Sequence, residues 1–207
     1  MKTLVVTQRV DDFHRINEKR DALDNRLINW LHRCGAVSFP IPNVYGSDKY
    51  NQILSEWLKK INPDGIILSG GNDLGQILNR DKLELKLIDY ANLNKLPLLG
   101  ICRGMQIIGK WAGAKLKEVT GHEKTRHKIS GLINANVNSY HKFGLSECPK
   151  NFIVTAKSPD NEIEGIKHST LPWEGWMWHP EREEKFDRKV EPLARSCLNQ
   201  ASVTVIK

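Results

Sequence analysis

The sequence is poor in cysteine, and its cysteines are scattered. It has four, and no two of them form a C-x-x-C pair. They stand at Cys34, Cys102, Cys148 and Cys197. Zinc sites and disulfide frameworks built on cysteine depend on characteristic spacings between paired cysteines. We therefore expect neither a zinc site nor a disulfide framework in this chain.

The chain also lacks long apolar runs. No apolar stretch reaches the length that spans a membrane. The apolar part of the first nine residues is too short for a signal peptide and is instead typical of a strand. We expect a cytoplasmic protein with no membrane partner.

Runs of a single charge are absent as well. The 31 Lys and Arg residues exceed the 24 Asp and Glu residues and give a net charge of +7, but the two signs are mixed along the chain. Nucleic-acid-binding domains gather their basic residues in a patch or stripe. The scattered charges favour a solvated surface with a locally positive pocket for an anionic substrate. We expect no nucleic-acid partner.

Strand and helix patterns alternate through the first half of the chain. Apolar runs predict strands at residues 4–7, 36–39, 65–68 and 96–99, and helical spacing predicts helices at residues 21–34, 48–60, 82–94 and about 105–111. This alternation indicates βαβ units and a mostly parallel sheet, hence an α/β fold. Shorter strand patterns follow at residues 133–138, 152–156, 163–167 and 175–178, before a last helix at residues 187–198. With no visible linker or repeat, we expect one domain over residues 1–207 with short antiparallel strands in its second half.

Cys102 stands where a predicted strand turns sharply into a predicted helix. The local pattern is G-x-C-x-G, with Gly100 and Gly104 on either side. Glycines remove the Cβ atoms that would clash at such a bend, and the bend resembles the nucleophile elbow G-x-S-x-G. The helix N-terminus favours a thiolate, and its free N–H groups can hold an oxyanion. We interpret Cys102 as a nucleophile rather than as a small buried core residue.

A thiol nucleophile needs a base, and His179 is set apart from the other histidines by its neighbours. A predicted strand delivers it into a turn that Pro180 stiffens, and Glu181 lies two residues further on. A carboxylate at that spacing could orient the imidazole and stabilise its charged form. A surface turn with incidental charges is the alternative that the H-P-E pattern alone leaves open.

Two further polar stretches follow predicted strands or turns. Ser69-Gly70-Gly71-Asn72-Asp73 lies at the carboxyl end of a strand, the edge where open parallel sheets build sites. We favour half of an oxyanion hole there, with the N–H groups of Gly71 and Arg103 as donors, over a mere tight turn. The stretch from Val137 to Phe143 holds a histidine beside an aromatic residue, and a solvated turn remains an equal alternative for it.

Taken in order, the segments GICRGMQ, SGGND, NSYHKF and WHPE resemble the glutamine amidotransferase-like superfamily with a Cys-His-Glu triad. Within that superfamily, the NSYHKF segment is similar to a stretch of the γ-glutamyl hydrolases. The resemblance covers nearly the whole chain. It implies a flavodoxin-like three-layer sandwich around a central, mostly parallel sheet, with Cys102, His179 and Glu181 as catalytic residues. It also implies substrate contacts from the following residues: Gly70, Asn72, Gln106, Ser139, Tyr140 and His141.

The implied reaction is hydrolysis of a γ-glutamyl amide through a cysteine thioester, without a metal or cofactor. The leaving group stays open. Short bacterial relatives include hydrolases of γ-glutamyl-CDP-amidate in capsule phosphoramidate biosynthesis, and Arg9, Arg103 and Lys142 are candidates to meet a nucleotide phosphate. A γ-glutamyl-aminobutyrate hydrolase is one alternative. A glutaminase subunit that delivers ammonia to a synthase partner is another, which we rank lower because no synthase domain is visible in the sequence.

A third alternative is a binding protein that kept the fold and lost the chemistry, against which the intact Cys102, His179 and Glu181 argue. The partners expected are the small-molecule γ-glutamyl substrate, of which a nucleotide could form part, and a second copy of the chain in a homodimer. A synthase partner is expected only for the glutaminase alternative.

Overall fold

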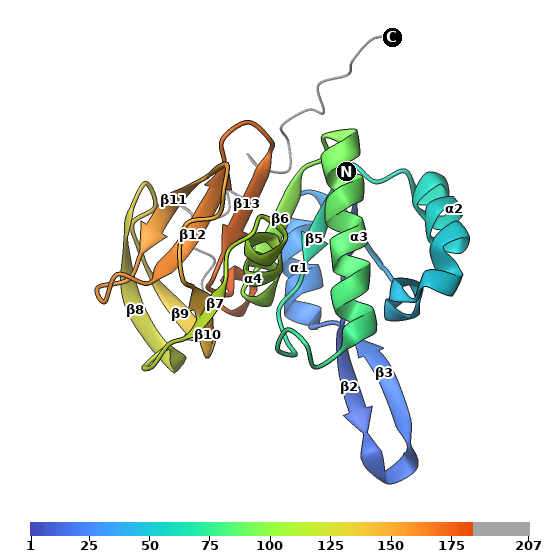
Figure 1. Ribbon diagram of the computed structural model, residues 1–207, viewed down its shortest axis with the longest axis horizontal. Coiled ribbons are helices and arrows are strands. Elements are labelled where there is room, and N and C mark those ends of the chain that lie inside the picture. Colours follow the sequence, from blue (N-terminus) through green and yellow to red (C-terminus); the bar gives the residue numbers. More distant parts are fainter. Residues whose placement is uncertain (184–207) are drawn as a thin grey trace.

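The computed structural model describes residues 1–183, and a single nine-stranded sheet runs through them (Figure 1). In order across the sheet, the strands are β4 (Ala36–Pro40), β1 (Lys2–Val6), β5 (Gly65–Leu68), β6 (Leu98–Ile101), β13 (Trp173–Trp176), β12 (Ile163–His168), β11 (Phe152–Lys157), β8 (Glu123–Gly131) and β9 (Ala135–Tyr140). The strands from β4 to β13 pair in parallel, and those from β13 to β9 pair antiparallel. The helix expected at residues 187–198 lies outside the described residues.

The parallel strands are buried because helices cover both faces of the sheet. All four residues of β5 and of β6 are buried. Successive side chains of a strand point to opposite faces. Val5 and Ile66 therefore pack in one core cluster with α2 (Asn51–Ile61), α3 (Leu78–Asn94) and α4 (Arg103–Trp111), whereas Leu4 and Ile67 pack with α1 (Asn25–Arg33) in the other. This three-layer arrangement confirms the predicted α/β class.

The segment between β1 and α1 differs from the expectation. Residues 21–34 were expected to be helical from the first residue, but the helix begins only at Asn25, where the Asp24 side chain accepts a hydrogen bond from the Arg26 N–H and caps it. The residues before it form a hairpin of β2 (Arg9–Phe13) and β3 (Glu18–Ala22) that projects from the body of the molecule (Figure 1). A charged, largely exposed hairpin has no apolar alternation, so its sequence gives no strand signal.

The second half continues the same sheet instead of forming separate hairpins packed on it. The strands expected at residues 152–156 and 163–167 are confirmed as β11 and β12. The polar residues 123–131 carry no strand pattern in the sequence, yet they form β8, which pairs with β9. Strands β7 (Leu116–Glu118) and β10 (Phe143–Leu145) form a separate small sheet. No helix within residues 1–183 is both long and apolar enough to cross a membrane.

Candidate active site

Cys102 lies at the bend between β6 and α4, in a conformation that few side chains adopt. Its φ is 52° and its ψ is −105°, and its N–H donates to the Trp176 carbonyl at 2.7 Å. A Cβ atom on Gly100 would lie 2.4 Å from the Gly104 carbonyl carbon, and one on Gly104 would lie 2.0 Å from the Leu68 carbonyl oxygen. Close backbone packing therefore requires glycine at both positions. This packing holds Cys102 in its strained backbone conformation, which costs about 1–3 kcal/mol.

His179 and Glu181 form a buried pair at the end of the sheet that carries the elbow. His179 follows β13 and precedes the short 3₁₀ helix Pro180–Arg182, and its Nδ1 lies 2.6 Å from Glu181 Oε1. Both side chains are buried. The Asn138 side chain holds the His179 backbone from both sides, accepting from its N–H at 3.0 Å and donating to its carbonyl at 2.7 Å. The imidazole is thus fixed through its ring and through its main chain.

The charge state of His179 depends on its two neighbours. Burial lowers the pKa of the imidazole, but Cys102 and then Glu181 outweigh burial and raise the pKa to about 9. A raised pKa at a buried histidine beside a thiol favours the imidazolium, which stabilises a thiolate next to it. Gly70 permits this packing, because a Cβ atom there would lie 2.6 Å from His179 Cε1. The arrangement can therefore both activate a nucleophile and move a proton.

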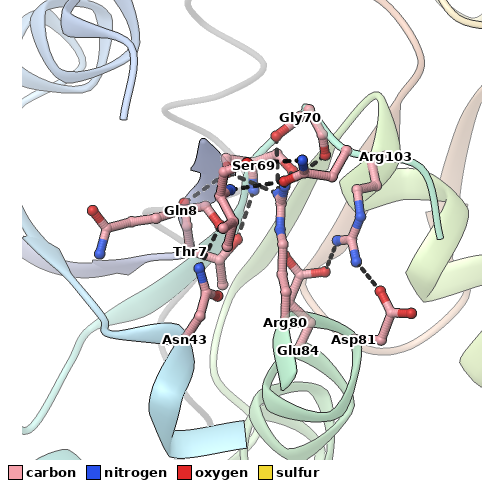
Figure 2. A network of polar contacts seen from close by, with 12 residues as sticks. Thr7, Gln8, Asn43, Ser69, Gly70, Arg80, Asp81, Glu84 and Arg103 are labelled. Atoms are coloured by element: carbon pink, nitrogen blue, oxygen red, sulfur yellow. Dashed lines mark hydrogen bonds and ion pairs between the residues drawn. The ribbon is translucent and has the colours of Figure 1, made fainter. Parts of the chain in front are cut away.

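A buried ionic network holds the loop that faces the elbow (Figure 2). Arg80 on α3 is fully buried and donates to the carbonyls of Ser69, Gly70 and Gly71 at 2.8, 2.9 and 2.5 Å. It also pairs with Glu84, at 3.1 Å. Burial lowers the pKa of Arg80 to about 10, so the guanidinium remains charged at neutral pH. One side chain thus orients three successive peptide groups.

Arg103 belongs to the same network through its side chain. Its guanidinium pairs with Glu84 and Asp81, as Figure 2 shows. The Arg103 side chain is almost entirely buried. The expectation that this guanidinium could meet a substrate phosphate is therefore wrong, because both of its ends are occupied by carboxylates. Among the described residues, the N–H groups of Gly71 and Arg103 have no hydrogen-bond partner. Both residues line a pocket of about 210 Å³ that also contains Cys102 and His179, which we call the nucleophile pocket.

Three of the expected substrate contacts line the nucleophile pocket. Gln106 and His141 contribute buried side chains, and the Tyr140 ring stands edge-on to His179 with its centroid 5.9 Å away. Gln106 Nε2 donates to the Phe143 carbonyl at 2.8 Å, which leaves its carbonyl oxygen as the group to offer a substrate. Their contacts with a substrate stay a prediction.

The other expected contacts are used within the protein. Ser139 is fully buried, does not line the nucleophile pocket, and donates its hydroxyl to the His122 carbonyl at 2.7 Å, so the expectation of a substrate contact is wrong. That expectation was wrong because side chains alternate between the two faces of β9, and Ser139 points to the buried face. Asn72 lines the pocket, but its amide exchanges hydrogen bonds with the Val10 backbone and accepts from Arg80. Gly70 lies on the other side of His179 and makes room for its ring.

A basic cleft adjoins the nucleophile pocket and was missed in the sequence. It has a volume of about 760 Å³ and shares Tyr140 and Arg182 with the nucleophile pocket. Its other lining side chains are Arg26, Asn29, His32, Arg33, Glu181 and Glu183. The Arg182 guanidinium stacks over the Tyr140 ring at 4.8 Å and stands at the junction between the two cavities. These cations come from α1 and from the segment after His179, so no local charge run could reveal them.

Comparison with known proteins places this geometry in a family. Residues 21–197 match the model of glutamine amidotransferase class-I. The chain belongs to the class-I glutamine amidotransferase family. Members of that family are hydrolases and amidotransferases, so the chain is an enzyme. Residues from the segments 69–73 and 102–106 line the same pocket.

Curated relatives include both hydrolases and components of amidotransferases. The chain is 34% identical to gamma-glutamyl-CDP-amidate hydrolase of Campylobacter jejuni, over 86% of this chain and 89% of that one. It is 31% identical to anthranilate synthase component 2 of Methanocaldococcus jannaschii, over 78% and 82%. It is 36% identical to the glutamine-hydrolyzing GMP synthase subunit of Pyrococcus abyssi, over 76% and 82%.

Solved structures confirm the fold. A GMP synthase subunit from Thermoplasma acidophilum superimposes with a TM-score of 0.72 at 22% identity, over 96% of this chain and 92% of that one. A glutamine amidotransferase from Thermotoga maritima gives a TM-score of 0.65 at 16% identity, over 95% and 96%. The glutamine amidotransferase-like three-layer fold predicted from the sequence is therefore confirmed.

Proposed function

We propose that the protein hydrolyses a γ-glutamyl amide bond through a thioester on Cys102. One observation carries the proposal: Cys102, held at a positive φ at the start of α4, shares a pocket with His179, whose ring is paired with buried Glu181. The Cys102 thiolate attacks the γ-carbonyl carbon and forms the carbon–sulfur bond. The N–H groups of Gly71 and Arg103 hold the resulting oxyanion.

His179 then moves the protons. As an imidazolium it protonates the departing nitrogen as the carbon–nitrogen bond breaks, which leaves a γ-glutamyl thioester on Cys102. As a neutral base it next takes a proton from water, and the hydroxide adds to the thioester carbonyl. Collapse releases free glutamate and returns the Cys102–His179 ion pair. Glu181 orients the imidazole and stabilises its charged form throughout.

The rim of the nucleophile pocket suits the glutamyl group. Asp73, Glu123 and Lys142 line the pocket beside Gln106. Carboxylates at the rim can receive the α-ammonium of a glutamyl group, and a lysine can receive its α-carboxylate. Charged contacts far from the reacting carbonyl can position it against Cys102, so a γ-glutamyl group is the acyl part that we assign.

The basic cleft favours a large anionic leaving group. Arg26, Arg33 and Arg182 surround it, and arginine is well suited to phosphate oxygens. A nucleotide linked through a phosphoramidate nitrogen would place its phosphates there while its γ-glutamyl group fills the nucleophile pocket. The C. jejuni relative named gamma-glutamyl-CDP-amidate hydrolase supports this substrate. A place in capsule phosphoramidate biosynthesis would follow from it, whereas γ-aminobutyrate is a much smaller leaving group than the cleft can hold.

A second function is favoured by other relatives. Anthranilate synthase component 2 and the GMP synthase subunit of P. abyssi are named as components of larger synthases. On that alternative the chain would hydrolyse glutamine and deliver ammonia to a synthase partner. The same Cys102 chemistry serves both functions, so the leaving group is what separates them.

The experiment measures kcat/KM for γ-glutamyl-CDP-amidate, γ-glutamyl-aminobutyrate and glutamine in the wild type, Arg26→Ala and Lys59→Ala. Arg26 lines the basic cleft, and Lys59 is an exposed control on α2. We expect the nucleotide conjugate to be best and Arg26→Ala to lower its kcat/KM about 10-fold or more, the loss of one charge-assisted hydrogen bond, while glutamine is unaffected. Added salt should weaken the apparent binding of the conjugate more than that of glutamine. If glutamine is best, the glutaminase alternative replaces the proposal.

A further inference from the structure

A cluster of three histidines and one glutamate lies beside the nucleophile pocket, which one of them, His141, also lines. His122 precedes β8, His127 lies on β8, His141 lies between β9 and β10, and Glu164 lies on β12. Glu164 is fully buried, and His122 and His141 are each 3% exposed. Four ligating side chains from separate segments therefore converge on one buried point.

Four distances within the cluster match the spacing of ligands around one ion. Glu164 Oε1 lies 3.2 Å from His122 Nδ1, and 3.4 Å from both His127 Nε2 and His141 Nε2. His122 Nδ1 lies 3.2 Å from His141 Nε2. Ligands held about 2.0–2.1 Å from a tetrahedral zinc ion stand about 3.3 Å apart. The ligand atoms of His122, His127 and Glu164 all lie within 4.8 Å of one another.

The cluster leaves buried polar atoms without hydrogen bonds. Both carboxylate oxygens of Glu164 and the Nε2 atom of His127 have no hydrogen-bond partner of acceptable geometry. Leaving such atoms unpaired in the interior is energetically unfavourable. Three ring nitrogens lie at ion-pair distance from the same carboxylate oxygen, an arrangement that suits one shared positive charge at the centre.

The outer nitrogens of two histidines have partners that fix where the protons sit. His122 Nε2 lies 2.9 Å from Asp160 Oδ2, and His141 Nδ1 lies 3.2 Å from the Phe143 carbonyl oxygen. Carboxylate and carbonyl partners keep the proton on the outer nitrogen, as they do for metal-bound histidines. The inner nitrogens then direct lone pairs at each other and at the Glu164 carboxylate. Acceptors facing one another at 3.2–3.4 Å need a positive charge between them, which a proton on one ring or a shared metal ion can supply.

We propose that His122 Nδ1, His127 Nε2, His141 Nε2 and Glu164 Oε1 bind a divalent zinc ion. Imidazole nitrogens with one carboxylate oxygen are zinc ligands, whereas Mg²⁺ and Ca²⁺ prefer sets of oxygens. Four protein ligands make a closed, structural site. The scattered cysteines led us to expect no zinc site, and they remain outside this one. It is separate from Cys102, His179 and Glu181.

The ion would secure one wall of the nucleophile pocket. Strand β8 pairs with β11 only at Ser130 and Gly131, at the end of β8 far from His122. A zinc ion shared by His122, His127 and Glu164 would therefore tie the β8–β9 hairpin to β12 at the end where β8 does not pair with β11. Strand β9 carries Tyr140 and Asn138, the residue that holds the His179 backbone.

The test is metal binding, measured apart from activity. The wild type and Cys102→Ser are stripped with a chelator, dialysed and titrated with Zn²⁺ and with Co²⁺. The Cys102→Ser chain excludes the catalytic thiol as a ligand. We expect one ion per chain in both, and a Co²⁺ absorption spectrum of a four-coordinate site with no thiolate band. If Cys102→Ser binds no stoichiometric Zn²⁺, the proposal is wrong whatever other variants do.

Two variants in the Cys102→Ser background locate the ion. His127→Ala removes the most accessible histidine of the cluster, and His14→Ala removes an exposed histidine at the tip of the β2–β3 hairpin. We expect His127→Ala to weaken Zn²⁺ binding roughly 100-fold or more and His14→Ala to leave it unchanged. Zn²⁺ should also slow hydrogen exchange in β8 and β9 but not in β1 or β5. Equal Zn²⁺ affinity in the two variants would place the ion elsewhere.

Discussion

The parallel and antiparallel halves of the sheet hold their parts of the site by different means. In the parallel half, β6 and α4 fix Cys102 through backbone packing that leaves no room for a Cβ atom at Gly100 or Gly104. In the antiparallel half, His179 is held by polar contacts: Glu181 on its ring and Asn138 on its main chain. The proposed nucleophile is thus placed by close packing, and its proposed base by hydrogen bonds. Substitutions in the two halves should therefore affect activity and stability in different ways.

The largest effect is expected from removing the nucleophile in the parallel half. Cys102→Ala should lower kcat by on the order of 10⁴-fold or more while the chain stays folded, because the reaction loses its covalent step and the position makes little packing demand. The measurement is glutamate release alongside a thermal unfolding curve. Cys148→Ala changes an exposed cysteine and is the matched control, expected to keep wild-type kcat. Wild-type turnover in a folded Cys102→Ala chain would end the covalent mechanism.

The next largest effect distinguishes the roles of His179 and Glu181. His179→Ala should cost more than Glu181→Gln, by roughly 10- to 100-fold in kcat, because the imidazole moves the proton and the carboxylate only orients and stabilises it. Rate constants are compared in variants whose circular dichroism matches the wild type. A larger loss in Glu181→Gln than in His179→Ala would reverse the assigned roles.

A smaller effect should follow from breaking the buried network under the Gly71 loop. Arg80→Ala leaves Glu84 buried with Arg103 alone and removes the contacts to three loop carbonyls. We expect a loss of about 3–5 kcal/mol in the free energy of unfolding. In chains that remain folded, kcat should fall by about tenfold, because an oxyanion donor is misplaced.

The matched control for Arg80 lies two residues away on the same helix. Lys82 pairs with Asp48, but both side chains are largely exposed. Lys82→Ala should change the free energy of unfolding by less than about 0.5 kcal/mol and leave kcat unchanged. Denaturant unfolding of both variants measures the difference. A loss of similar size in both would mean that the buried network gives the loop no special support.

The smallest expected effect is a pH dependence of the free energy of unfolding. It depends on the interaction between Cys102 in one half and His179 in the other. The pKa of His179 is raised to about 9 in the folded chain, from an ordinary value of 6.5. Its contribution to stability is therefore complete below about pH 6.5 and is lost as the pH rises through 9. Cys102 is a main cause of the shift, so Cys102→Ala should flatten this decline. Free energies of unfolding between pH 6 and 10 test it, and identical slopes would contradict the coupling.

Local patterns predicted the parts of the site that depend on neighbours in the chain. The spacing of Gly100, Cys102 and Gly104 encodes the elbow, and His179 and Glu181 lie two residues apart, so both could be found in the sequence. Arg80 could not, because its role depends on carbonyls ten residues away that only the packing of α3 against β5 brings near it. Asn138 was missed for the same reason, since its contact with His179 crosses between distant strands.

The elements of the fold also divide into those that local sequence patterns predicted and those that they did not. Buried strands such as β5 are marked by continuous apolar residues, and the parallel half was predicted accordingly. The β2–β3 hairpin and β8 are largely exposed and polar, so their strand pairing leaves no apolar period to detect. The prediction for Ser139 was wrong because it rested on residue type alone. The alternation of β9 buries the Ser139 hydroxyl, which donates to the His122 carbonyl.

The most direct test of the covalent account is to trap the acyl-enzyme. Wild type and Cys102→Ser are mixed with γ-glutamyl-CDP-amidate, quenched in acid within the first turnover, and measured by intact-protein and peptide mass spectrometry. The account predicts that wild type gains the mass of one glutamyl group on the peptide containing Cys102, and that Cys102→Ser gains none. Turnover without that adduct in wild type, or the same adduct on another residue, would contradict it.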